Sequence, residues 1–100
     1  MTNVIIVKKD KIDTIEIKGH TNYSESGSDI VCASISSIII TSANICLRID
    51  NSSISYEISD GYMKITVLKH SEIIDLVINN ILEELKTLEK KYKKYIKINI

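Results

Sequence analysis

The sequence predicts an α+β fold with the element order β-β-α-β-β-α-β, in which two helices pack on a mostly antiparallel sheet. Two observations support this fold class. Five short segments have the apolar or alternating pattern of strands, whereas two longer segments repeat their apolar residues every three or four positions, as helices do. Four of the short segments also form neighbouring pairs separated by turn residues, which is typical of antiparallel hairpins.

The first hairpin comprises residues 4–8 and 14–18, which we expect to pair around a turn at residues 9–11. A helix follows, with Ser28 or Asp29 as its predicted N-cap. Its apolar residues recur at three- and four-residue steps and so share one face. That face consists of Val31, Ile35, Ile38, Ile39, Ser42 and Ile45.

The second half of the chain predicts a hairpin, a long helix and a closing strand. Residues 52–59 and 63–67 alternate on either side of Asp60-Gly61, a typical two-residue turn. Ser71 is the predicted cap of the long helix, and residues 95–100 alternate again as a strand. The apolar stripe of the long helix consists of Ile74, Val77, Ile78, Ile81, Leu85 and Leu88.

The composition indicates a single domain over residues 1–100, because 100 residues with 44% hydrophobic content can bury one modest core. The formal net charge is zero, so no global field attracts nucleic acid or an anionic membrane. We therefore expect neither membrane association nor direct nucleic-acid binding. One basic cluster is present, which we interpret as a solvated helix end whose cations complement the helix dipole. It consists of Lys90, Lys91, Lys93, Lys94 and Lys97.

Three features favour a cytoplasmic protein. Residues 4–7 are too short for the apolar region of a signal peptide and are followed at once by charged residues. No run approaches the roughly 20 apolar residues that span a bilayer. Cys32 and Cys46 lie on one predicted helix, roughly 21 Å apart, too far for a disulfide.

The chemistry of the chain is concentrated between Gly19 and Cys32. His20 follows a predicted strand, and Cys32 falls in the expected first turn of a helix, where the dipole and free N–H groups favour a thiolate. An imidazole nearby can take and return the proton. Residues 21–29 are polar and lack a hydrophobic period, so we expect a loop able to cover a site.

Gly19-His20, followed by Gly27-Ser28-Asp29-Ile30-Val31-Cys32-Ala33 and Ser36, resembles the signature of the ribosomal-processing cysteine protease family, Prp. The order of predicted elements is similar to that family over essentially all 100 residues. The sequence departs from the family pattern at Thr21, where alanine is expected, and at Tyr23-Ser24.

The resemblance implies a cysteine endopeptidase with Cys32 as nucleophile and His20 as base. It also implies the substrate, which is the N-terminal extension of bacterial large-subunit ribosomal protein number twenty-seven, and it implies a homodimer. No cofactor is expected. No metal is expected either, because the sequence has neither a CxxC pair nor a helical histidine pair.

Four further residues are candidates for supporting roles, namely Gly19, Gly27, Asp29 and Ser36. Asp29 either caps the helix or orients His20 or the substrate. Ser36 lies one turn after Cys32 and either hydrogen-bonds within the site or lines the core.

The remaining cysteine and histidine have simpler interpretations. Cys46 lies between apolar residues and is expected in the core, and His70 precedes a helix start, where we expect a capping or solvent role.

Two rival functions stay open. A non-catalytic ribosome-associated assembly protein would bind through the lysine cluster, either to ribosomal RNA or to an acidic protein neighbour. A redox-sensing thiol protein would need a resolving cysteine near Cys32, and Cys46 is too far along the helix to serve within one subunit.

Overall fold

The computed structural model describes residues 1–19 and 26–100, with the backbone alone for residues 26–29. Within these ranges the elements follow the expected order, which confirms the predicted α+β fold class. They are β1 (Thr2–Lys8), β2 (Ile12–Lys18), α1 (Ser26–Ile49), β3 (Ile54–Ser59), β4 (Tyr62–Val67), α2 (Glu72–Lys91) and β5 (Ile96–Asn99).

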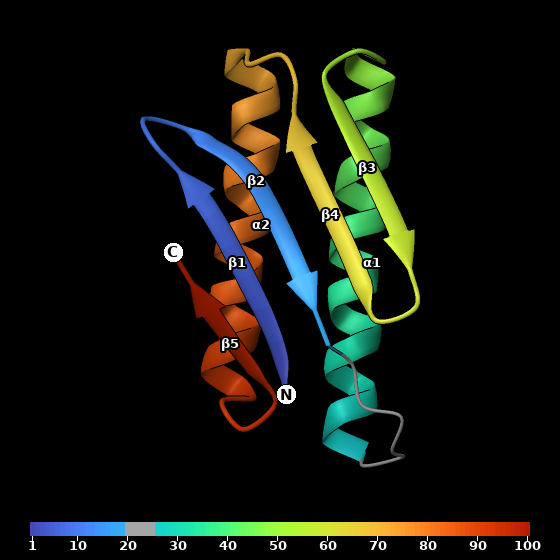
Figure 1. Cartoon of the computed structure of the whole chain (residues 1–100), viewed down its shortest axis with the longest axis vertical. Coiled ribbons are helices and arrows are strands. Elements are labelled where there is room, and N and C mark those ends of the chain that lie inside the picture. The colour runs from blue at the N-terminus through green and yellow to red at the C-terminus, as the bar shows by residue number, and fades with distance from the viewer. Residues whose placement is uncertain (20–25) are drawn as a thin grey trace.

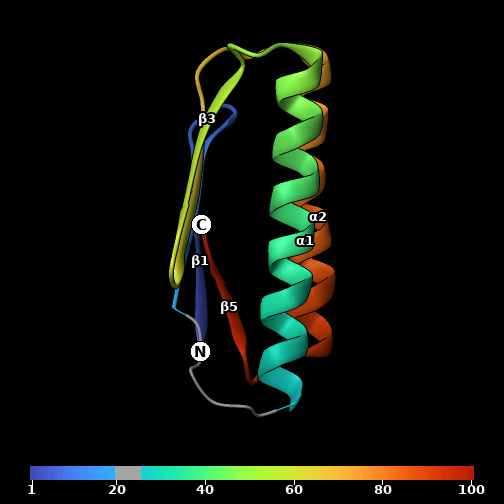
Figure 2. The ribbon, with the colours of Figure 1, turned by 90° about the vertical axis from the view of Figure 1, so that its right-hand side faces the viewer.

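The strands form one sheet in the spatial order β3-β4-β2-β1-β5. Neighbouring strands are antiparallel except β1 and β5, the first and last strands of the chain, which run parallel. Both helices cover the same face of the sheet, so the domain has one layer of strands and one of helices (Figure 1, Figure 2). The other face of the sheet is left uncovered by helices.

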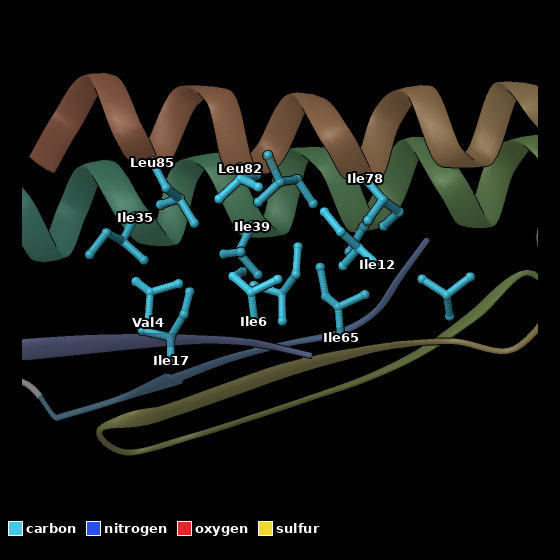
Figure 3. Packing of buried hydrophobic residues seen from close by; sticks show 14 of the residues in the cluster. Val4, Ile6, Ile12, Ile17, Ile35, Ile39, Ile65, Ile78, Leu82 and Leu85 are labelled. Carbon is cyan, nitrogen blue, oxygen red and sulfur yellow. The ribbon is translucent and has the colours of Figure 1, made fainter. Parts of the chain in front are cut away.

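The core lies between these two layers and is built mainly from isoleucine (Figure 3). Successive side chains of a strand point to opposite faces, so alternate residues such as Val4 and Ile6 of β1 face the helices and are buried. The helices bury one stripe each. The buried hydrophobic residues are Val31, Ile35, Ile39, Ala43 and Cys46 of α1, and Ile74, Ile78, Ile81, Leu82 and Leu85 of α2.

The predicted turns and caps of the second half are confirmed. Ser59 pairs with Tyr62 across the Asp60-Gly61 turn, and Gly61 has a positive φ of 70° that suits glycine. At the start of α2 the Ser71 hydroxyl accepts a hydrogen bond from the Ile74 N–H at 3.2 Å.

The predicted N-cap of α1 is wrong, because the helix begins at Ser26 and therefore already includes Ser28 and Asp29. The last four residues of the expected loop over residues 21–29 thus belong to the helix. The apolar stripe begins only at Val31, so periodicity carries no information on polar residues in the turn before it. β1 and β2 likewise begin two residues earlier than expected, at Thr2 and Ile12.

The expectation that no segment could span a membrane is wrong for α1. Residues Ile30–Ile49 are long and apolar enough to do so by length and composition, because serine, threonine and asparagine interrupt the apolar run without adding charge. Core helices of globular domains have the same property. In the structure about a third of this segment is buried. The buried part is the stripe that begins at Val31, which packs against the sheet and α2.

His70 has neither the capping role nor the solvent role expected for it. Its ring instead connects Asp13 of β2 to Asp75 of α2. Its Nδ1 lies 2.6 Å from an Asp75 carboxylate oxygen and its Nε2 lies 3.1 Å from one of Asp13. Lys11 also approaches Asp75, at 3.4 Å. The hydrogen bond to Asp75 is the main cause that raises the pKa of His70, with Asp13 adding to it, since both carboxylates favour the imidazolium. Protonated His70 therefore ties the first hairpin to the start of α2.

We expect His70→Gln to destabilise the fold more in acid than in base. Because the folded-state pKa is raised, the stabilisation is complete below the unfolded pKa and is lost as pH rises through the folded pKa. The loss in free energy of unfolding should be about 1 kcal/mol larger at about pH 5.5 than at about pH 9, measured by urea denaturation. The control variant Glu72→Gln removes an exposed acid from the first turn of α2. An equal loss from His70→Gln at both pH values would contradict this role.

Candidate active site

Cys32 lies in the second turn of α1, not in the first turn as expected, because the helix begins at Ser26. Its side chain is half-buried and carries a free thiol. The free N–H groups of a helix belong to its first four residues, here 26–29. The N–H of Cys32 itself lies beyond these four residues. The expectation from the sequence that free backbone N–H groups of the helix start lie at Cys32 is therefore wrong.

The Cys32 thiol lines a pocket of about 310 Å³ between α1 and one end of the sheet. The end of β2 and the β3–β4 turn form the opposite wall, beside the N-terminal half of α1 (Figure 1). Segments far apart in the sequence therefore meet at the thiol. The lining residues are Thr2, Ile17, Gly19, Cys32, Ile35, Ser36, Ser59, Asp60, Gly61, Tyr62 and Met63.

Gly19 is fixed at the edge of this pocket through both of its peptide groups. Its N–H donates to the Gly61 carbonyl at 3.0 Å, and its carbonyl accepts a hydrogen bond from the Thr2 hydroxyl at 3.2 Å. Its φ is +88°, and a Cβ at this position would lie 2.9 Å from the Met1 carbonyl oxygen. Only glycine satisfies both constraints. The backbone thus leaves β2 toward residue 20 from a defined position.

Thr2 is a pocket residue that the sequence analysis missed. Its side chain is 4% exposed, and its backbone N–H donates to the Tyr95 carbonyl at 2.9 Å. The signal was present, because Thr2 falls two positions before Val4 and so shares the buried face of the strand. A hydroxyl on such a face needs a partner, which here is Gly19.

Tyr62 was also missed, and it contributes to the pocket lining from the start of β4. Its hydroxyl donates to Glu16 Oε2 at 2.5 Å, across the antiparallel pair of β2 and β4. That bond is the main cause that lowers the pKa of Glu16 and raises the pKa of Tyr62 to about 12. The phenol therefore remains protonated at neutral pH and cannot serve as a base.

Some of the predicted site residues lie together in the structure, whereas others fall outside the described residues. Ser36 lines the same pocket as Cys32 and Gly19. His20 lies outside the described residues, as do the departures from the family pattern at positions 21, 23 and 24. Gly27 and Asp29 are the second and fourth residues of α1, where the backbone alone is described.

Cys46 provides an internal comparison for Cys32. It is 0% exposed in the core, as expected, and burial raises the pKa of its thiol. The part of the chain that the structure describes contains no group of three or more His, Cys, Asp or Glu side chains that could hold a metal ion. The described site thus offers one accessible thiol in a pocket that has both polar and apolar walls, an arrangement suited to nucleophilic attack on a bound carbonyl.

Comparison with known proteins gives consistent results. The model of the family described as cysteine protease Prp matches residues 1–97. The ribosomal processing cysteine protease Prp of Staphylococcus aureus strain Mu50 is 28% identical over 100 residues, which cover 97% of this chain and 94% of that protein. These findings agree with the resemblance inferred from the motif around Cys32.

Two solved structures of the S. aureus Prp protease are also similar to this chain. One, in complex with a substrate peptide, has a TM-score of 0.90 at 26% identity and covers 99% of this chain and 98% of its own. The other, with a covalently linked product peptide, has a TM-score of 0.87 at 27% identity with the same coverage. A Streptococcus mutans structure at 24% identity, with a TM-score of 0.88, shares the fold.

We expect Gly19→Ala to destabilise the protein by about 1–3 kcal/mol, because alanine is strained at positive φ and its methyl group would meet a backbone carbonyl. Urea denaturation measures the loss. The matched control is Gly61→Ala, which introduces a methyl group at another glycine of positive φ and should cost less. Equal losses would show that the contact with Met1 does not constrain Gly19.

Proposed function

This chain belongs to the Prp family of cysteine proteases, and we propose that it removes the N-terminal extension of bacterial large-subunit ribosomal protein number twenty-seven. Cys32 is the nucleophile and His20 the general base of this proposal. The observation that carries it is the contrast between two cysteines on one helix. Cys32 opens on the pocket, whereas Cys46 is sealed in the core.

The reaction begins when the Cys32 thiolate attacks the scissile carbonyl carbon and forms a carbon–sulfur bond, while His20 holds the thiol proton. The tetrahedral intermediate collapses as the carbon–nitrogen bond breaks, and His20 donates the proton to the leaving amine. Water, deprotonated by His20, then attacks the thioester. This step releases the carboxylic acid product and returns the proton to the thiol.

The supporting residues act on this chemistry through position. Gly19, held by Thr2 and Gly61, sets where the backbone enters position 20. Ser36 lines the pocket one turn after Cys32, where a hydroxyl can hydrogen-bond to a bound peptide. Asp29 and Gly27 lie in the first turn of α1, one turn before Cys32.

Both cysteines are free, which fits the proposed location in a reducing cytoplasm.

The relatives support a peptide substrate. The S. aureus Prp protease has been solved with a substrate peptide and with a covalently linked product peptide. Its fold matches this chain over nearly its whole length. The Cys32 pocket, at about 310 Å³, has room for about one or two side chains rather than a folded domain. An unfolded N-terminal extension meets that requirement.

Cleavage of the extended ribosomal protein should depend on Cys32 and His20 but not on Cys46. Mass spectrometry after incubation with each variant would show the shortened product for the wild type and Cys46→Ala. Cys32→Ala and His20→Ala should lose about a thousandfold or more in rate, because each removes a member of one catalytic unit. Intact substrate in every reaction would contradict the substrate assignment and favour a non-catalytic assembly factor.

The proposal includes a homodimer, and the exposed face of α1 is the surface that fits it. No charged residue occurs from Ile30 to Leu47, although 26% of the chain is charged. A neutral surface offers no charge to complement an acidic or basic partner, whereas two copies can meet there by a two-fold axis. Small residues at four-residue spacing would let two helices approach closely. The exposed residues of this face are Ile30, Ala33, Ser37, Ile40, Thr41, Asn44 and Ile45.

We expect Ile40→Glu to convert the dimer to a monomer, because a charge would be buried without a partner in the interface. Sedimentation velocity of the purified protein measures the change. Leu76→Glu is the matched control, since Leu76 is 67% exposed on α2, outside this face. A wild type that stays monomeric at high concentration, or equal dissociation of both variants, would overturn this assignment of the interface.

A further inference from the structure

A second hollow, the lysine groove, lies where α2 ends and β5 begins. It has a volume of about 620 Å³ and shares no lining residue with the Cys32 pocket. Figure 1 shows β5 beside the C-terminal end of α2, at the opposite end of the helix from its Ser71 cap. The basic residues that line the groove are Lys86, Lys90, Lys93 and Lys97.

Lysines outnumber acids in the lining of the groove, which therefore carries a net positive charge. Lys86 pairs with Glu83 at 3.5 Å. The other acid in the lining, Glu89, accepts the Ile98 N–H at 2.7 Å. Among the described residues, Lys90, Lys93 and Lys97 form no ion pair. The zero net charge of the chain therefore hides a local concentration of cations.

The helix dipole explains only part of this concentration. Lys90 and Lys91 lie in the last turn of α2 and complement its negative end. Lys93 and Lys97 lie beyond the helix, where the effect of the dipole has faded, and yet both line the same groove. The helix dipole therefore does not account for Lys93 and Lys97.

The chemistry of the lining favours a phosphate backbone over a protein surface. Interfaces between proteins are depleted in lysine and enriched in arginine and aromatic residues. Among the described residues that line the groove, the basic ones are all lysine and none is aromatic. Lysine side chains neutralise phosphates as mobile point charges and release counterions when they do so.

We propose that the lysine groove binds the phosphate backbone of RNA, without sequence preference. This binding is separate from catalysis, because the groove and the Cys32 pocket are distinct. The expectation from the sequence that the protein does not contact nucleic acid considered only the net charge of the chain. The proposal considers where the charges lie on the surface. An acidic protein partner is the competing outcome.

Fluorescence anisotropy with a labelled single-stranded RNA of mixed sequence tests the proposal. Three neutralised phosphates, one for each lysine without an ion pair, predict a slope of about −2.1 in a plot of log affinity against log salt, or about twentyfold weaker binding at about 200 mM than at about 50 mM salt. Full-length Cys32→Ala should bind as the wild type does. Binding by this variant separates a failure of the RNA proposal from a failure of the proposed protease function.

Lys93→Gln combined with Lys97→Gln should weaken RNA binding and reduce the slope by about 1.4. The matched control, Lys8→Gln combined with Lys9→Gln, removes the same charge from the β1–β2 turn and should leave both unchanged. Three results would overturn the proposal: no binding at about 50 mM salt, equal weakening by both double variants, or displacement of the RNA by an acidic polypeptide at a lower concentration than unlabelled RNA requires.

Discussion

The helical phase of α1 is the constraint on which the site depends. The stripe that starts at Val31 must face the sheet, because it supplies the contact between the two layers. Cys32 follows Val31 by one residue and is therefore rotated by about 100° to the edge of the stripe, where the pocket opens. Cys46 falls in phase with the stripe and is sealed. The same side chain on the same helix thus either opens on the pocket or is sealed in the core, according to its rotation.

A second requirement is that three distant segments converge on that edge. The Thr2 hydroxyl and the Gly61 carbonyl hold Gly19 from β1 and from the β3–β4 turn. The pocket exists only when the sheet order places these segments together. The stability of the sheet and the geometry around the thiol are therefore coupled, and a loss of pairing between β2 and β4 would alter both.

Local patterns explain why the order of elements, the Asp60-Gly61 turn and the Ser71 cap could be predicted, since each depends on neighbours in the sequence. The helix start at Ser26 could not be predicted in this way, because polar residues before the stripe carry no periodicity. The hydrogen-bond partners of Thr2 and Tyr62 could not be predicted for a different reason. Their partners, Gly19 and Glu16, lie 17 and 46 positions away, and only the register of the strands brings them into contact.

The net charge of the chain does not show how its charges are distributed over the surface. The chain has 13 basic and 13 acidic residues, which predicts no attraction to any charged partner. In space, however, α1 has a face without charge from Ile30 to Leu47, whereas five lysines occur within residues 90–97. Screening limits the reach of each charge to about 10 Å at 0.1 M salt, so a partner experiences the nearest patch and not the sum. A chain without net charge can therefore present one uncharged surface and one polycationic surface, and a partner responds to the groups within that distance of each surface.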